Sequence, residues 1–294
     1  MPLQPAPSAI RAVEIVRYLA DHPGEVYSVA ELARRVEQSR ATCQAVLLAL
    51  EPSHWVRRGK DGYTLGAGLI SIGAAAQQGA AVVGLLRTAA RELYEELGCE
   101  VLGYLPAGDR LINVSRVGPG SLMSVTMVEG QAFPLAPPNG LAFAAWDESD
   151  LEAWIGRAPK TNKAKQDRLR KAAQIVRGLG YSVLLDPVTR REIRSTIDEL
   201  SEARRQLLTV ALTHDDLLGA DIDAAENMRV SLLSAPVFGS DGSVSGLLGV
   251  VFDVHRYADV AELAESLKSA CRKLSDTLGA PHIQALGALA ARPE

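Results

Sequence analysis

The clearest pattern of apolar and polar positions lies between Ser28 and Leu65, and it predicts a helix that opens a compact unit. Ser28 and Glu31 have the S-x-x-E spacing of a capping box, in which each residue satisfies a free backbone donor of the first helical turn. The apolar residues that follow recur at helical spacing: Val29, Leu32, Ala33 and Val36. The stretch therefore begins with a short amphipathic helix.

A second helix and a β-hairpin complete this unit. Ser39 can cap the second helix, and Pro52 ends it. Its apolar face is formed by Cys43, Val46, Leu47 and Leu50. Segments 55–58 and 63–65 are predicted to be short strands, because the Gly59-Lys60-Asp61-Gly62 sequence between them favours a hairpin turn. The order predicts a winged helix-turn-helix, whose second helix enters the DNA major groove.

Local charge supports a DNA-binding role for this unit, although the whole chain carries a net charge of −4. The segment from Arg34 to Lys60 contains six basic and two acidic residues, so the elements that would face the DNA phosphates carry a net charge of +4. We predict DNA contacts by Ser28, Gln38, Ser39, Arg40, Thr42, Gln44, Arg57, Arg58 and Lys60. The alternative is a helical domain whose basic rim is only solvated.

The 25 residues from Gly62 to Leu86 include no charged side chain. A membrane span needs only about 20 apolar residues, but 12 of these 25 residues are Ala or Gly, which insert weakly, and the run contains Gln77 and Gln78. We therefore expect no membrane span but a linker helix over 69–86. Because its uncharged surface would be an exposed apolar patch on a monomer, we expect a homodimer or homotetramer.

The remainder of the chain predicts an α+β domain, a sheet with helices on its faces. Strands are expected at 100–105, 111–117, 124–128, 181–185, 207–213, 228–238 and 244–253, and helices at 88–97, 140–146, 163–179, 186–205 and 257–278. We expect a Pro-rich loop at 130–139 that ends in Asn139 as a helix cap, a capping box at Ser149 and Glu152, and a loop at 214–226.

Several segments in this order resemble the IclR family of bacterial transcription regulators. The resemblance is carried by 9–15, 29–33, 62–66, 133–140 and 234–242. Proteins of this family join an N-terminal winged helix to a C-terminal GAF-like effector domain. The resemblance thus implies a DNA-binding domain at 1–68 and an effector-binding domain at 87–280, joined by the linker helix expected at 69–86. The tail at 281–294 is expected to fray.

The chain departs from the family pattern in its DNA-binding unit. The family usually has Gly where Glu37 and His54 stand, and often Arg where Ala45 stands. Ala41, Ala45 and Leu48 lie opposite the core face of the second helix, where they can touch a thymine methyl but cannot hydrogen-bond a base edge. DNA specificity is then modest or rests on the wing and on DNA shape.

The resemblance also implies a small organic acid as effector. The corresponding pocket would be lined by Met123, Val125, Leu135, Asn139, Gly140, Leu141, Leu232 and Ser234. The N–H groups of a helix that begins after Asn139 would favour an anion. In the alternative reading these are ordinary core residues beside one capped helix.

No catalytic or metal motif stands out. The five histidines are scattered without an H-E-x-x-H pattern, and Gly242-Ser243-Val244-Ser245-Gly246 has Val in the nucleophile position. The sequence His214-Asp215-Asp216 falls on an expected loop, where such groups are more often solvated than bound to metal. We expect no enzyme, no catalytic residue, no cofactor and no metal.

The cysteines indicate a reduced, cytoplasmic protein. Cys43, Cys99 and Cys271 are odd in number and far apart, and none belongs to a C-x-x-C. The partners expected are double-stranded DNA, a small effector and further copies of the chain. Two other classes stay open: an enzyme whose catalytic groups come from separate loops, and a protein-interaction or dimerisation module whose winged helix has lost specific DNA readout.

Overall fold

The computed structural model describes residues 5–119, 128–158, 161–184, 230–253 and 260–281. The chain divides into two compact units, Met1–Ala81 and Val82–Glu294. Each unit has its own hydrophobic core, and each is described by itself.

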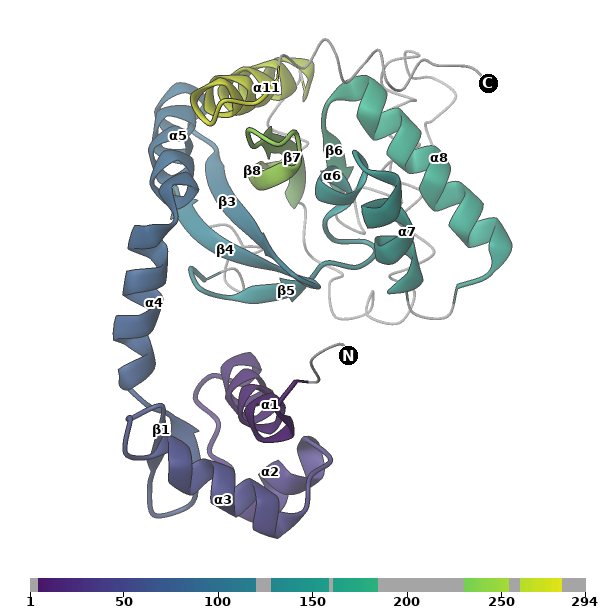
Figure 1. Ribbon diagram of the computed structural model, residues 1–294. Coiled ribbons are helices and arrows are strands. Elements are labelled where there is room, and N and C mark those ends of the chain that lie inside the picture. Colours follow the sequence, from purple (N-terminus) through teal and green to yellow (C-terminus); the bar gives the residue numbers. More distant parts are fainter. Residues whose placement is uncertain (1–4, 120–127, 159–160, 185–229, 254–259, 282–294) are drawn as a thin grey trace. The chain divides into compact units, whose positions relative to one another are not determined.

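The first unit is a winged helix-turn-helix followed by a helix. Its elements are α1 (Pro7–Asp21), α2 (Val29–Arg35), α3 (Arg40–Leu50), β1 (Val56–Arg58), β2 (Tyr63–Leu65) and α4 (Gly68–Gly79) (Figure 1). The core joins α1, α2, α3 and the wing through Ile15, Leu19, Leu32, Cys43, Leu47, Val56 and Tyr63, all almost fully buried. The predicted apolar faces of the two central helices are confirmed.

The predicted caps of α2 and α3 are also confirmed. The Ser28 hydroxyl accepts the Glu31 backbone N–H at 3.3 Å, while the Ser28 backbone N–H donates to the Glu31 carboxylate at 2.8 Å. The Ser28 hydroxyl also donates to the Glu31 carboxylate at 2.7 Å, and this hydrogen bond, followed by that from the Ser28 backbone N–H, lowers the pKa of Glu31. At the next helix, Ser39 Oγ accepts the Thr42 backbone N–H at 3.1 Å.

The wing is held against the helices by a third extended segment. β1 and β2 pair antiparallel with Val56 opposite Leu65, and Tyr27 exchanges backbone hydrogen bonds with Tyr63 at 3.1 and 2.8 Å. Gly62 has φ 153°, and a Cβ there would lie 2.3 Å from the Tyr27 carbonyl oxygen. Glycine is therefore required where the turn of the hairpin meets Tyr27.

The second unit is built on an antiparallel sheet, in which the described residues form six strands in the order β5-β4-β3-β8-β7-β6. Its elements are α5 (Ala81–Leu97), β3 (Glu100–Ala107), β4 (Arg110–Val117), β5 (Ala132–Pro134), α6 (Leu141–Ala144), α7 (Glu148–Gly156), α8 (Lys163–Leu179), β6 (Ser182–Leu184), β7 (Val230–Phe238), β8 (Val244–Asp253) and α11 (Val260–Thr277). The predicted α+β architecture is confirmed.

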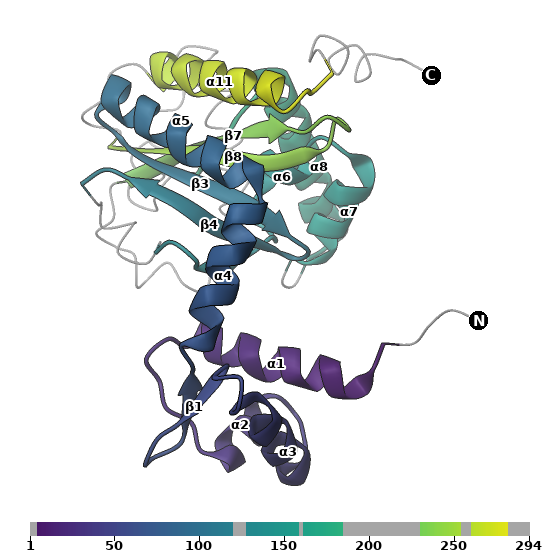
Figure 2. The same cartoon turned by 60° about the vertical axis from the view of Figure 1, so that its left-hand side comes forward.

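Helices cover both faces of this sheet. Figures 1 and 2 show α5 and α11 on one face and α6, α7 and α8 on the other. Close contact with α5 is possible because β3 and β8 carry glycine beneath it: a Cβ at Gly246 would lie 3.1 Å from Leu86 Cδ1. On the opposite face, Tyr104, Leu111 and Leu247 share a core with the buried side chains of α6, α7 and α8.

The helix expected over 69–86 is divided in the structure. α4 ends at Gly79, Ala80 has the extended angles φ −98° and ψ 91°, and α5 begins at Ala81. Glycine has a low helix propensity, so the break falls beside it. Within the described residues no single helix is long and apolar enough to cross a membrane; α4 and α5 reach that threshold only when counted together as a bent pair.

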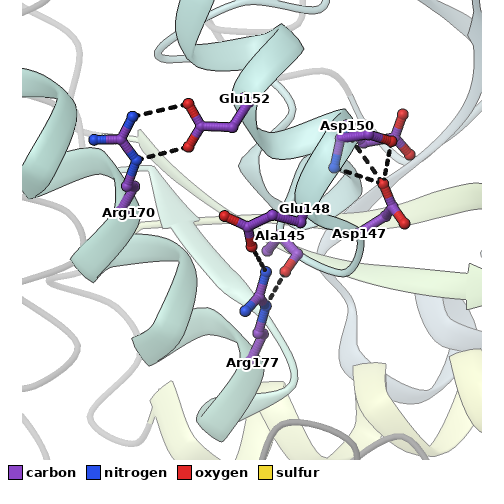
Figure 3. A network of polar contacts seen from close by, with 8 residues as sticks. Ala145, Asp147, Glu148, Asp150, Glu152, Arg170 and Arg177 are labelled. Carbon is purple, nitrogen blue, oxygen red and sulfur yellow. Dashed lines mark hydrogen bonds and ion pairs between the residues drawn. The ribbon is translucent and has the colours of Figure 1, made fainter. Parts of the chain in front are cut away.

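Three local expectations for the second unit are wrong. The loop expected at 130–139 contains a strand, β5, which pairs with β4. Asn139 does not cap α6, because Gly140 occupies the cap position with φ 85° and the helix covers only Leu141–Ala144. Instead of a Ser149–Glu152 box, Asp147 caps α7 by accepting the backbone N–H groups of Ser149 and Asp150 (Figure 3).

Other predicted elements are either confirmed or lie outside the described residues. The helix at 163–179 and the hairpin of 228–238 with 244–253 are confirmed by α8, β7 and β8, with shifts of at most two residues at their ends. The expected strand at 124–128 and the elements expected at 186–226 fall wholly or mostly outside the described residues.

Candidate DNA-binding surface and effector pocket

The wing carries three exposed cations. Arg57 and Arg58 lie on β1, and Lys60 lies in the turn that follows. No other residue in the described part of the chain forms a hydrogen bond or ion pair with these side chains, so their charges are available to an outside partner. A row of exposed cations on a hairpin is suited to the phosphate backbone of a nucleic acid.

The outward face of α3 combines polar and apolar side chains. Arg40 is exposed and Gln44 is half-buried, and neither side chain is engaged by another described residue. The same face exposes three apolar residues, Ala41, Ala45 and Leu48, and 51% of the Leu48 surface is accessible to solvent. Arg and Gln can donate to base edges, whereas the apolar residues can only contact methyl groups.

Four of the predicted DNA-contacting residues have structural roles. The hydroxyls of Ser28 and Ser39 serve as helix caps, and Thr42 Oγ1 lies 2.8 Å from Ser39 Oγ. Gln38 Nε2 donates to the Glu14 carboxylate at 2.9 Å and to the Arg11 carbonyl at 3.3 Å, which ties the turn before α3 to α1. The side chains left free for DNA are therefore chiefly those of Arg40, Gln44 and the wing.

Two backbone features of this surface were not foreseen from local patterns. Glu37 and His54 adopt left-handed φ values of 52° and 55°. At both positions the family pattern usually has glycine, which adopts left-handed φ values without strain. The presence of Glu and His at these usual glycine positions is therefore the sequence feature that could have indicated the strained backbone.

The second unit contains a cavity between the sheet and α6. It has a volume of about 70 Å³ and is lined mainly by apolar side chains of β3, β4, β5, β6, β7, β8 and α6. A single water needs about 10–15 Å³, so the cavity has room for about five groups of that size. A small ligand fits this space.

The structure brings five of the predicted effector residues together in this lining: Asn139, Gly140, Leu141, Leu232 and Ser234. Leu135 lies just behind it, since a Cβ added at Gly140 would lie 2.3 Å from Leu135 Cδ1. Met123 and Val125 lie outside the described residues.

The polar groups of the cavity are hydroxyls and amides. The lining includes Tyr104, Asn139, Ser182 and Ser234, and no charged residue among those described. Burial raises the pKa of Tyr104, with a smaller contribution from Glu100, so its hydroxyl stays neutral at physiological pH. Gly140 and Leu141 line the same space, and their backbone N–H groups form no hydrogen bond within the described residues.

Sequence reasoning missed the contribution of β6. Ser182, Val183 and Leu184 line the cavity because β6 pairs with β7, with Ser182 opposite Ser234. The strand itself was predicted, but its neighbour in the sheet depends on long-range pairing. Tyr104 was likewise placed in a predicted strand, and Phe133 in the expected Pro-rich loop, without a role in the pocket.

The described residues contain no cluster of three or more His, Cys, Asp or Glu side chains that could hold a metal ion. All three cysteines are buried free thiols. Burial raises the pKa of Cys43 and Cys271, so these two thiols stay neutral.

Comparison with known proteins identifies the DNA-binding unit. Residues 8–59 match the family model of the IclR helix-turn-helix domain. The chain superposes on the IclR transcriptional regulator of Alicyclobacillus acidocaldarius with a TM-score of 0.66 and 21% identity, covering 93% of this chain and 99% of that one. The chain has the fold of an IclR-family transcription regulator.

Two further solved structures share this IclR fold. An IclR family transcriptional regulator from Brucella abortus has a TM-score of 0.65 at 15% identity, with 94% of this chain and 93% of that one covered. An IclR homolog from Microbacterium hydrocarbonoxydans, complexed with 4-hydroxybenzoate, has a TM-score of 0.60 at 13% identity and coverages of 92% and 98%. No curated protein sequence matches the chain.

Proposed function

We propose that this IclR-type chain is a cytoplasmic transcription regulator that binds double-stranded DNA through α3 and the wing, and that a small organic acid modulates its binding. The observation that carries the proposal is the set of exposed, unshared cations on the wing of an IclR helix-turn-helix domain. Such cations provide the sequence-independent attraction to the phosphate backbone, and the second helix of a helix-turn-helix provides the contacts in the major groove.

The mode of DNA recognition follows from which side chains are free. Arg57, Arg58 and Lys60 contact phosphates and set the orientation, and this contact carries no sequence information. Arg40 and Gln44 are the two side chains of α3 with free donors, so direct readout involves few bases. Part of the specificity then comes from the shape and deformability of the DNA.

Self-association accompanies DNA binding in this proposal. None of the residues of α4 is buried, no charge lies on this helix, and Ile70 and Ile72 are 74% and 45% exposed. A symmetric dimer, or a tetramer built from dimers, would cover these residues and present two helix-turn-helix units to two half-sites.

The effector site is the cavity between the sheet and α6. Its apolar walls suit a short carbon skeleton, and the unpaired N–H groups of Gly140 and Leu141 are donors for a carboxylate. The small volume favours an acid with few non-hydrogen atoms. Such a ligand would change DNA affinity only if it binds the free and DNA-bound conformations with different affinity.

The test is a nuclease-protection assay on the DNA upstream of the chain's own coding region, with and without a panel of short-chain organic acids. We expect a protected site whose occupancy changes with at least one acid. The same acid should raise the melting temperature of the protein without DNA, since it binds the folded state. If a site is protected but its occupancy changes with no acid, the proposal of DNA binding is retained and the proposal of an effector is refuted.

A second candidate is a protein-interaction or dimerisation module in which the winged helix no longer reads DNA. The apolar outer face of α3, with Leu48 exposed, favours it. In that case no duplex would be bound in a salt-dependent manner, and substitution of Leu48 by a polar residue would weaken association with a protein.

A further inference from the structure

A second cavity of the C-terminal unit lies outside the effector pocket. It has a volume of about 170 Å³ and is bounded by α11, by the end of β7 and by the segment that follows α6. An apolar cavity of about 150 Å³ is large enough to bind benzene. This space, at about 170 Å³, therefore accommodates one six-membered ring.

The walls of this cavity are aromatic and aliphatic. Trp146 and Phe238 meet edge to face with ring centroids 5.2 Å apart, and Ala235, Pro236 and Cys271 complete the apolar lining. Burial raises the pKa of the Cys271 thiol to about 12, and its Sγ lies 3.6 Å from the Ala235 carbonyl oxygen. The thiol therefore behaves as a neutral, apolar wall.

Hydrogen bonds hold the wall in place without a ligand. The Trp146 indole N–H donates to the Ala142 carbonyl at 2.9 Å, which fixes the plane of the ring. The preceding residue is also anchored, because Arg177 of α8 donates to the Ala145 carbonyl and lies 3.6 Å from the Glu148 carboxylate (Figure 3). A preformed wall lowers the entropic cost of binding.

The charged residues that border this cavity leave an excess of positive charge. Glu265 pairs with Lys268 at 2.6 Å, and the Lys268 ammonium also lies 5.8 Å from the centre of the Tyr181 ring. Arg272 donates through Nε to the Lys268 carbonyl at 3.4 Å, and it has no carboxylate partner among the described residues. The guanidinium group is therefore free to form a second, charged hydrogen bond at the border of the cavity.

We propose that this cavity is a second ligand site, distinct from the effector pocket, which takes a monocyclic carboxylate with its ring against the wall formed by Trp146 and Phe238 and its carboxylate at Arg272. The ring would be enclosed by apolar and aromatic side chains, and the anion would remain at the solvent-accessible border. The size of the cavity, its preformed aromatic wall and the unshared charge of Arg272 support this class of ligand.

The three tryptophans of the chain allow a direct test with benzoate as the probe. Trp146 lines the proposed site, Trp154 donates to the Asn139 carbonyl at 2.7 Å beside the effector pocket, and Trp55 lies in the DNA-binding unit. The full chain would be labelled with 5-fluorotryptophan, its resonances assigned by single Trp→Phe variants, and benzoate titrated while fluorine spectra are recorded.

We expect benzoate to shift the Trp146 resonance saturably and to leave Trp55 unchanged. Arg272→Gln should weaken this binding by about two- to fivefold, the range of an exposed ion pair, whereas Lys273→Gln, an exposed cation on the same helix that does not line the cavity, should have no effect. Benzamide, which has the same shape without the charge, should bind more weakly than benzoate.

Other outcomes would overturn the proposal. A Trp146 resonance that does not move, or a shift confined to Trp154, would mean that the ring does not enter this cavity. Equal affinities of the wild-type chain, Arg272→Gln and Lys273→Gln for benzoate would remove the role of the guanidinium and with it the assignment of a carboxylate.

Discussion

The two left-handed residues of the DNA-binding unit give a quantitative stability prediction. Glu37 has φ 52° and His54 has φ 55°. Steric strain destabilises a residue with a Cβ by about 1–2 kcal/mol in this conformation. Glycine avoids the strain, but its greater loss of conformational entropy on folding costs about 0.5–1 kcal/mol. Glu37→Gly and His54→Gly should each raise the free energy of unfolding of the first unit by about 0.5–1 kcal/mol.

Matched variants separate the backbone from the side chain. Both side chains are exposed and form no hydrogen bond with another described residue, so their removal alone should change little. Glu37→Ala and His54→Ala keep the Cβ and therefore the strain, and they should not be stabilising. Gly24→Ala is the reverse case: its φ is 85° and no atom lies within 4 Å of the added Cβ, so the same balance of strain and entropy should lower the free energy of unfolding by about 0.5–1 kcal/mol.

Native-state hydrogen exchange of the α3 amides in the full chain is the suitable assay, because it reports the opening free energy of this unit separately from the second. We expect protection to increase in both glycine variants and to be unchanged in both alanine variants. If the alanine variants gained as much protection as the glycine variants, the effect would come from the side chains and the reasoning would be refuted.

Three further predictions concern DNA, assembly and ligand response. Gln44→Ala should change affinity for the specific site by up to about 1–3 kcal/mol while leaving binding to unrelated DNA unaltered, as competition binding would show; a uniform loss would contradict base readout. Ile70→Glu should weaken self-association because it would bury an unpaired charge, measured by sedimentation; a wild-type monomer at micromolar concentration would refute the assembly proposal. Gly140→Val should abolish the thermal shift caused by organic acids, because a Cβ there would lie 2.3 Å from Leu135 Cδ1; a retained shift would place the ligand elsewhere.

Sequence patterns were sufficient where the interactions are local. The capping box of Ser28 and Glu31 and the Ser39 cap involve residues within one helical turn, so their spacing predicts them. The bounds of α8, Lys163–Leu179, were predicted without error because Asn162 caps the helix and Gly180, with φ 83°, ends it. The DNA-binding unit is built largely from such local signals.

Long-range contacts account for what the sequence did not predict. β5 is only three residues long and exists through its pairing with β4. β6 contributes to the effector pocket because it lies beside β7, which is far away in the sequence. The amide of Gln38, a predicted DNA contact, donates to Glu14 of α1, and no local pattern indicates this contact between the two segments.

The salt dependence of DNA affinity tests the central proposal most directly. If Arg57, Arg58 and Lys60 each contact one phosphate, the double variant Arg57→Ala/Arg58→Ala removes about four contacts per dimer, which makes the slope of log affinity against log salt less steep by about 3.6. Fluorescence anisotropy on the upstream DNA would measure it, with Lys171→Ala, an exposed cation of the second unit, as the control. We predict a steep slope for the wild-type chain and for Lys171→Ala and a flattened one for the double variant; a wild-type chain that shows no salt-dependent binding to any duplex would contradict the regulator proposal.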